Sequence, residues 1–208
     1  MTGVLIAFVI VLLVPLFVGT WRTSLLGLAL QGALMTSISL RVHGKELTLD
    51  TALSVVDLFA LRMVALPLAL YVVLRAHNAP LRNDVIAPNL FSWAMALALV
   101  VLAFRSADVL VPLEGNEQML VAVAASAFLL GLFVLSTGRG TVSQIIGVMR
   151  VENAIALFEI GSASQHESLG IRIGQTAVLL VSIGFFRWYL VGLLREESTP
   201  AAPAKAAL

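Results

Sequence analysis

The sequence predicts an all-α integral membrane protein, a bundle of about seven transmembrane helices. Of its 208 residues, 60% are hydrophobic and 12% are charged, whereas soluble domains carry about 25% charged residues. The mean hydropathy is +1.00. Apolar runs of about 20 residues, the length that crosses a bilayer as a helix, follow one another along most of the chain. No segment alternates polar and apolar residues with the period of two that barrel strands show.

The predicted spans follow one another with short connections. They comprise residues 3–20, 24–40, 51–74, 86–104, 119–136, 141–162 and 169–194. The first lacks a positively charged start and a small-residue cleavage site, so we expect a retained helix rather than a signal peptide. In the third, Pro67 removes a backbone donor and predicts either an ordinary bend or a hydrated kink beside Arg62. We expect one transmembrane domain over residues 1–197 and a disordered, Pro- and Ala-rich tail over residues 198–208.

The basic residues of the predicted loops set the orientation, because loops rich in Lys and Arg stay in the cytoplasm. One side of the membrane holds six of them, namely Arg22, Arg75, Arg82, Arg139, Arg195 and Lys205. The other side holds three, namely Arg41, Lys45 and Arg105. We therefore expect the N-terminus outside and the C-terminus in the cytoplasm.

The composition excludes several classes of function. The net charge is +1 and no basic cluster is present, so nucleic acid is not an expected partner. The absence of Cys excludes disulfides, thiolate metal sites and iron–sulfur clusters. The chain contains no GxSxG motif, no phosphate-binding glycine loop and no His, Asp and Glu cluster with metal spacing. We expect no cofactor, no metal and no catalytic residue, and the remaining chemistry is the handling of protons or ions.

The sixth predicted span contains the most unusual stretch of the chain, QIIGVMRVENAIALFE, from Gln144 to Glu159. Glu152 lies close to its midpoint, where a charge costs about 3 kcal/mol on insertion scales. Glu152 and Glu159 are seven residues apart, which places them on one helix face about 10.5 Å apart. Arg150 projects about 200° away from Glu152. This predicts that Arg150 belongs to another interface, such as one with a neighbouring subunit, and Asn153 fits an interhelical hydrogen bond.

Arg62 lies near the middle of the third span, at a depth close to that of Glu152. Opposite charges at one depth predict a pair, formed directly or through water. Asp57 is the poorer candidate partner, because five α-helical residues leave the two side chains about 140° apart. We expect Arg62 and Glu152 to lead a path for protons or ions, with Glu159, Asp57 and Gln175 as lesser members. A structural spacer with buried ion pairs is the alternative.

The other intramembrane charges favour structural roles. Arg172 lies one turn inside the outer boundary of the seventh span, where its side chain can reach the surface. Arg187 and Trp188 are typical of an interfacial belt at the cytoplasmic end. The residues expected to be structural or to lie at an interface are Arg150, Arg172 and Gln144.

A set of short motifs resembles a known family. The motifs are Leu130-Gly131-Leu132-Phe133, Arg139, Gly147, Asn153-Ala154, Leu157 and Gly174-Gln175, together with Arg62 to Leu66-Pro67-Leu68 and Ser143-Gln144-Ile145-Ile146-Gly147 to Glu152-Asn153. Through the first group, the last three spans resemble the three-helix K (4L-type) subunit of respiratory complex I. Through the second, most of the chain resembles a longer relative, component E of the hydrogenase-4 and formate-hydrogenlyase type. The first membrane glutamate of the K subunit falls at Met149 here, and the acid follows one turn later as Glu152.

The resemblance implies a non-catalytic subunit of a complex I-like, hydrogenase-linked respiratory assembly in the cell inner membrane. Its implied partners are antiporter-like membrane subunits, membrane lipids and a redox module of the nickel–iron hydrogenase type. There the charged residues would contribute to an intramembrane path for protons or sodium. The alternative is a free-standing secondary ion or solute transporter, although the sequence shows no inverted repeat and no matching glycine-interrupted half-helices.

Overall fold

The computed structural model describes residues 2–13, 16–18, 20–43, 49–76, 90–110, 115–138, 140–162 and 169–198. Every regular element in these residues is helical, which confirms the predicted all-α class. In chain order the elements are α1 (Thr2–Leu13), α2 (Trp21–His43), α3 (Leu49–Val55), η2 (Val56–Ala65), α4 (Leu66–Ala76), α5 (Leu90–Leu110), α6 (Asn116–Thr137), α7 (Thr141–Ser162) and α8 (Leu169–Ser198). Elements α3, η2 and α4 follow one another without a break and form one long helix.

Five helices in the described residues are long and apolar enough to cross a membrane, which indicates a membrane protein. They are Trp21–Val42, Ala52–Ala76, Leu90–Ala107, Asn116–Thr137 and Ile173–Arg195. Helix α7 is not among these five. It coincides with the predicted span and is as long as α6, but its charged and amide side chains make it less apolar. The count of seven spans therefore stays a prediction, and the expected tail after residue 198 lies outside the described residues.

Helix α1 differs most from its predicted span. The span was expected to cover residues 3–20, yet the helix ends at Leu13, and residues 16–18 are not α-helical. Pro15 gives the sequence reason, because a proline disfavours helical conformation in the residue before it. A helix of 12 residues is about 18 Å long, little more than half of a hydrocarbon core of about 30 Å.

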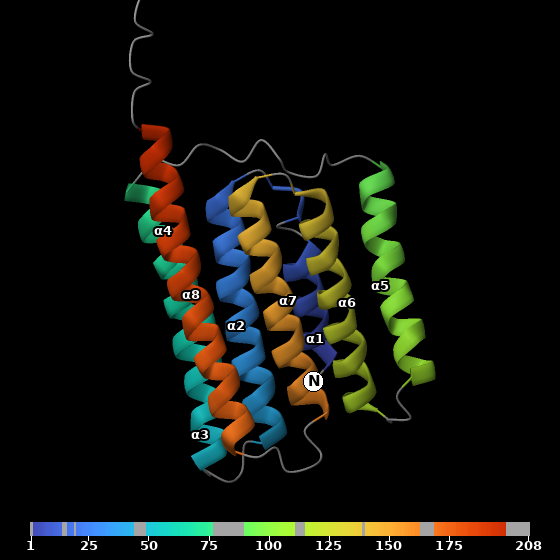
Figure 1. Ribbon diagram of the computed structural model, residues 1–208. Coiled ribbons are helices and arrows are strands. Elements are labelled where there is room, and N and C mark those ends of the chain that lie inside the picture. The colour runs from blue at the N-terminus through green and yellow to red at the C-terminus, as the bar shows by residue number, and fades with distance from the viewer. Residues whose placement is uncertain are drawn as a thin grey trace, which may run out of the picture.

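The helices stand side by side, and successive long helices run in opposite directions (Figure 1). Helices α1, α2, α6 and α7 occupy the middle, α8 and the α3–η2–α4 helix lie on one side, and α5 lies on the other (Figure 1). Helix α7 packs most closely on α6 and next on α2, whereas α8 packs mainly on α4 and α5 on α6. The alternation agrees with the predicted placement of the two ends on opposite sides. Which side faces the cytoplasm stays a prediction.

The tryptophan and tyrosine residues belong to the halves of their helices that lie towards one end of the bundle. They are Trp21 at the start of α2, Tyr71 in α4, Trp93 near the start of α5, and Trp188 and Tyr189 in α8. At the same end the guanidinium of Arg22 lies 5.3 Å from the centre of the Trp21 ring, and that of Arg75 lies 5.8 Å from the Tyr71 ring. Aromatic and basic residues gather in this way where helices meet the membrane surface.

Glycines mark several of the closest approaches between helices. A Cβ atom added to Gly32 of α2 would lie 2.6 Å from the backbone nitrogen of Met63 in η2. One added to Gly131 of α6 would lie 2.8 Å from Cγ2 of Val151 in α7. Small residues at such crossings let membrane helices come close enough for side chains to hydrogen-bond across them. The backbone beside Arg62 therefore lies directly against α2.

Candidate functional site

The winding of η2 decides which residues meet Arg62. In η2 the backbone hydrogen bonds join residues five apart, as between the Leu66 N–H and the Leu61 carbonyl at its end. This π-helical pattern stacks residue i over residue i+5, unlike an α-helix. Arg62 Nε therefore donates to Asp57 Oδ2 at 3.0 Å. The prediction that Asp57 is a poor partner was wrong, because it assumed α-helical winding where the chain is wound more widely, directly before Pro67.

Arg62 also connects η2 to two other helices. Its Nη1 donates to Asn153 Oδ1 of α7 at 3.1 Å, and Asn153 Nδ2 donates to Gln31 Oε1 of α2 at 3.2 Å. Thr176 Oγ1 of α8 donates to the other carboxylate oxygen of Asp57 at 3.3 Å. The side chains of Arg62 and Asp57 are only 7% and 16% exposed. A continuous chain of polar contacts thus joins α2, α7, η2 and α8 inside the bundle.

Glu152 and Glu159 line one cavity together with Arg62. The cavity has a volume of about 370 Å³ and lies between η2, α7 and α8, with Gln175 and Gly174 in its wall. This confirms the expectation that the two glutamates share one face of α7. Arg62 attracts the Glu152 carboxylate across the cavity and Asp57 repels it. The direct ion pair of Arg62 is nevertheless with Asp57.

Each glutamate has a neutral partner on α8. Ser182 Oγ donates to Glu152 Oε1 at 3.4 Å, and Gln175 Nε2 donates to Glu159 Oε1 at 2.6 Å. The second oxygen of Glu152 is buried and accepts no hydrogen bond from the residues that the structure describes. A carboxylate with an unsatisfied oxygen inside a membrane bundle is costly, so this site calls for water, a proton or a further donor.

Arg150 faces away from Glu152, as predicted, but its surroundings differ from the expectation. Its side chain is buried at 2% exposure, and Nη1 donates to the Leu12 carbonyl at 3.4 Å. The last carbonyls of a helix lack partners within it, and the negative end of the helix dipole lies there. Arg150 thus caps the end of α1 within the same chain. The prediction that Arg150 lies at an interface with a neighbouring subunit was therefore wrong.

Four predicted residues remain. Gln175, which was expected to be a lesser member of the ion path, lies in the wall of the cavity. Gln144 is exposed near the start of α7. Arg172 belongs to α8, but its side chain lies outside the described part, and its predicted role is untested. Arg187 is exposed towards the end of α8, beside Trp188 at 71% exposure, which fits an interfacial belt.

Three side chains that bond to the predicted site residues were not singled out in the sequence, namely Gln31, Thr176 and Ser182. Gln31 is fully buried near the middle of α2, and a lone amide in an apolar span is a signal that could have identified it. Thr176 and Ser182 carry no such signal, because single hydroxyls in membrane helices commonly bond their own backbone. Thr36 does so here, through Oγ1 to the Gly32 carbonyl at 2.8 Å.

The side chains of the site limit the chemistry that is available to it. Carboxylates, a guanidinium, amides and hydroxyls can hold and pass protons or bind small cations, but they provide no redox group. In the described ranges no group of three or more His, Asp or Glu side chains could hold a metal ion. Comparison with protein-family models, curated proteins and solved structures finds no match to this chain.

Proposed function

We propose that this chain is a non-catalytic membrane subunit of a complex I-like, hydrogenase-linked respiratory assembly. In this proposal its polar chain is part of the path along which protons or sodium ions cross the inner membrane. One observation carries the proposal: the Arg62 guanidinium serves two carboxylates, Asp57 through a direct bond and Glu152 through space, beside an open cavity between η2, α7 and α8.

Competition between the two carboxylates gives a mechanism. When Glu152 holds a proton, it no longer competes for the guanidinium, and the direct Asp57–Arg62 bond is strongest. When Glu152 releases its proton, it draws Arg62 away from Asp57. Two unit charges 4 Å apart attract by about 4 kcal/mol at an effective dielectric constant of about 20. Loss of the proton from Glu152 therefore adds an attraction on Arg62 that competes with its direct bond to Asp57.

Side chains bonded to Asp57 and Arg62 connect a movement of Arg62 to three other helices. Asp57 accepts a hydrogen bond from Thr176, so a weaker hold on Arg62 alters its contact with α8. Asn153 and Gln31 link the same guanidinium to α7 and α2. The proton itself moves between Glu152 and Glu159 through water, for which the cavity has room. The energy comes from a redox module, since these side chains supply none.

Purification of the tagged full-length chain from its native membranes in mild detergent tests the assembly. We expect antiporter-like membrane chains, bound nickel and hydrogen-dependent reduction of a viologen dye to co-purify with it. The same membranes carrying the untagged chain are the control. A chain that purifies with neither nickel nor dye reduction contradicts the proposal.

A free-standing secondary transporter is the second candidate, and α1 favours it. Transporters build ion sites from helices that end inside the membrane, with side chains or ions at the exposed backbone groups. Helix α1 ends after 12 residues, and Arg150 caps one of its last carbonyls. If the purified chain alone exchanges protons for sodium in proteoliposomes, this candidate replaces the first.

A further inference from the structure

We propose that the open face of α7 is the docking site of one transmembrane helix from a partner subunit, which brings a Lys or Arg to Glu152. The inference rests on the proposed function, because it names the partner element of the same site. The face, called here the α7 groove, consists of Glu152, Ile155, Phe158 and Glu159. It lies between α8 on one side and α6 with α5 on the other (Figure 1).

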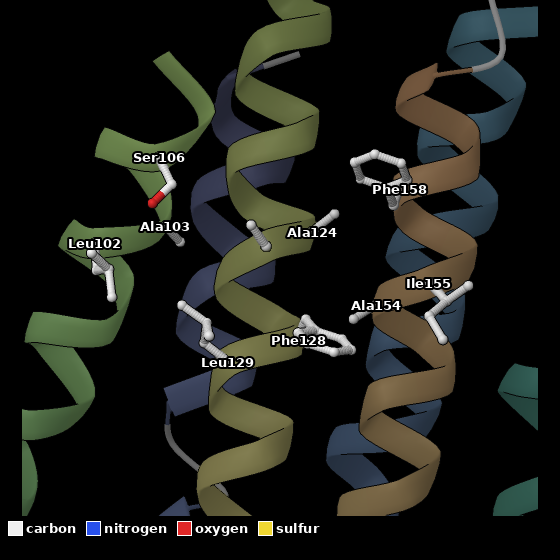
Figure 2. Close-up of a pocket in the computed structure, with 10 residues that line it drawn as sticks. Leu102, Ala103, Ser106, Ala124, Phe128, Leu129, Ala154, Ile155 and Phe158 are labelled. Carbon is white, nitrogen blue, oxygen red and sulfur yellow. The ribbon is translucent and has the colours of Figure 1, made fainter. Parts of the chain in front are cut away.

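The groove is hollow on both sides of Ile155. On the α8 side lies the cavity of about 370 Å³ that holds Glu152 and Glu159. On the α5 side lies a second hollow of about 400 Å³, and Ile155 lines both. Figure 2 shows the second hollow, with Phe128 of α6 and Phe158 of α7 across the gap between the two helices. Its wall is apolar except for Ser106 of α5.

The occupant has to cover a face that the rest of the chain leaves open. Ile155 and Phe158 are 48% and 45% exposed, although α7 is otherwise the central helix. Helices α8 and α5 pack on α4 and α6 and make few contacts with α7. A face with a carboxylate near its midpoint is expected to lie against protein rather than lipid. An apolar helix fits between α8 and α5, because its side chains can fill both hollows.

The charges in the cavity specify one cation on the occupant. The charged groups that act on Glu152 are Arg62, which attracts it, and Asp57, which repels it. One guanidinium thus lies among three carboxylates, because Glu159 lines the same cavity, and it is bonded directly to Asp57. The buried Oε2 of Glu152 accepts no hydrogen bond from the described residues. A Lys or Arg from the partner helix would balance this charge from the open side of the cavity.

Two other occupants fit less well. Glu152 is eleven residues from the start of α7 and ten from its end, about 15 Å from either surface, so an amine in a lipid headgroup does not reach it. A second copy of the chain offers few cations in its described part: Arg62 and Arg150 are buried, and Arg22 lies at the start of α2. Arg187, about one turn past the middle of α8, is exposed, and the crosslinking test below distinguishes a second copy that presents it from a partner helix.

Photocrosslinking in native membranes tests the docking site. A benzoylphenylalanine at position 155 of the full-length chain should crosslink to a membrane helix of another protein. Mass spectrometry of the crosslinked peptide should find a Lys or Arg within about two turns, ~11 Å, of the crosslinked residue. The same photoprobe at Ile10 of α1, which is 54% exposed, is the matched control and should not reach that helix. Crosslinks only to lipid, to a second copy, or to a helix without a basic residue overturn the inference.

Two variants test the fit and the charge separately. Ile155→Trp fills the groove with an apolar side chain and should reduce co-purification of the partner, whereas Ile10→Trp should not. Glu152→Lys should reduce it by more than about tenfold, because like charges placed together cost several kcal/mol. Reversing the identified basic residue of the partner to Glu should restore it, and failure to do so overturns the charge assignment.

The same experiments keep this inference separate from the proposed function. If Glu152→Gln abolishes ion movement but no basic helix crosslinks at position 155, the docking site is wrong and the ion path stands. If a basic helix docks while Glu152→Gln moves ions normally, the docking site stands and the ion path is wrong.

Discussion

Gly32→Ala tests whether the close crossing of α2 and η2 holds the polar chain together. The new Cβ would lie 2.6 Å from the backbone nitrogen of Met63, whereas ordinary contact begins at 3.4 Å. The two helices must therefore separate by about 0.8 Å, and the obstacle is backbone, which cannot rotate away. Such a shift is large enough to take the 3.1 Å bond from Arg62 to Asn153 beyond hydrogen-bonding distance.

The cost can be estimated against a matched control. Overpacking costs about 1–3 kcal/mol, and a lost interhelical hydrogen bond adds about 0.6–1.7 kcal/mol. Alanine favours a helix over glycine by about 1 kcal/mol, so Gly184→Ala in α8, whose Cβ meets nothing within 4 Å, shows that gain alone. The difference between the two variants should therefore be about 2–5 kcal/mol.

Thermal unfolding in mild detergent measures this difference. A chain of about 200 residues loses about 2–4 °C in melting temperature for each kcal/mol. We expect Gly32→Ala to melt at least about 4 °C below Gly184→Ala, and its assembly to move fewer ions. If the two variants melt together and move ions equally, α2 does not position Arg62 and the reasoning is wrong.

Other predictions follow from the charges. Arg62→Met should destabilise the chain by about 3–5 kcal/mol, because it leaves Asp57 and Glu152 facing each other without a cation. Asp57→Asn should cost less, because Glu152 remains as a countercharge, and equal costs in detergent unfolding would refute the shared guanidinium. Adding Asp57→Asn to Arg62→Met should recover part of the lost assembly but not ion coupling, because it removes the carboxylate that Arg62 pairs with directly. Arg150→Met should cost about 1–3 kcal/mol, since it leaves the Leu12 carbonyl unpaired. A reporter fused to the C-terminus should report the cytoplasm, and a periplasmic signal would contradict the orientation.

The helical class and the position of α7 could be predicted from the sequence because hydropathy and length specify them. The bounds 141–162 agree with the structure, and the seven-residue spacing correctly placed Glu152 and Glu159 on one face of the helix, where they line the same cavity. Helical spacing also placed Arg150 on the opposite face. Its partner could not be predicted, because that requires knowing that α1 ends at Leu13 and beside which helix it ends.

The winding of η2 was beyond the reach of sequence reasoning. Rotation angles assume 3.6 residues per turn, and a change to the wider π-helical pattern exchanges the partners of every residue in the segment. The change of winding lies just before Pro67, at which a bend or a kink was expected. The pairing of Arg62 with Asp57 follows from it. Contacts such as Gln31 with Asn153 depend on how three helices meet, which no local pattern specifies.

The number of cations moved per hydrogen molecule oxidised tests the central claim most directly. It can be measured with the purified assembly in proteoliposomes, using a pH-sensitive dye for protons and radioactive sodium for sodium ions. Glu152→Gln keeps the size of the side chain and its contact with Ser182, and Glu117→Gln makes the same change at an exposed position in the first turn of α6. We predict that Glu152→Gln lowers the ratio while viologen reduction is unchanged, and that Glu117→Gln alters neither. An unchanged ratio in Glu152→Gln would show that the charged chain supports the structure and does not carry ions.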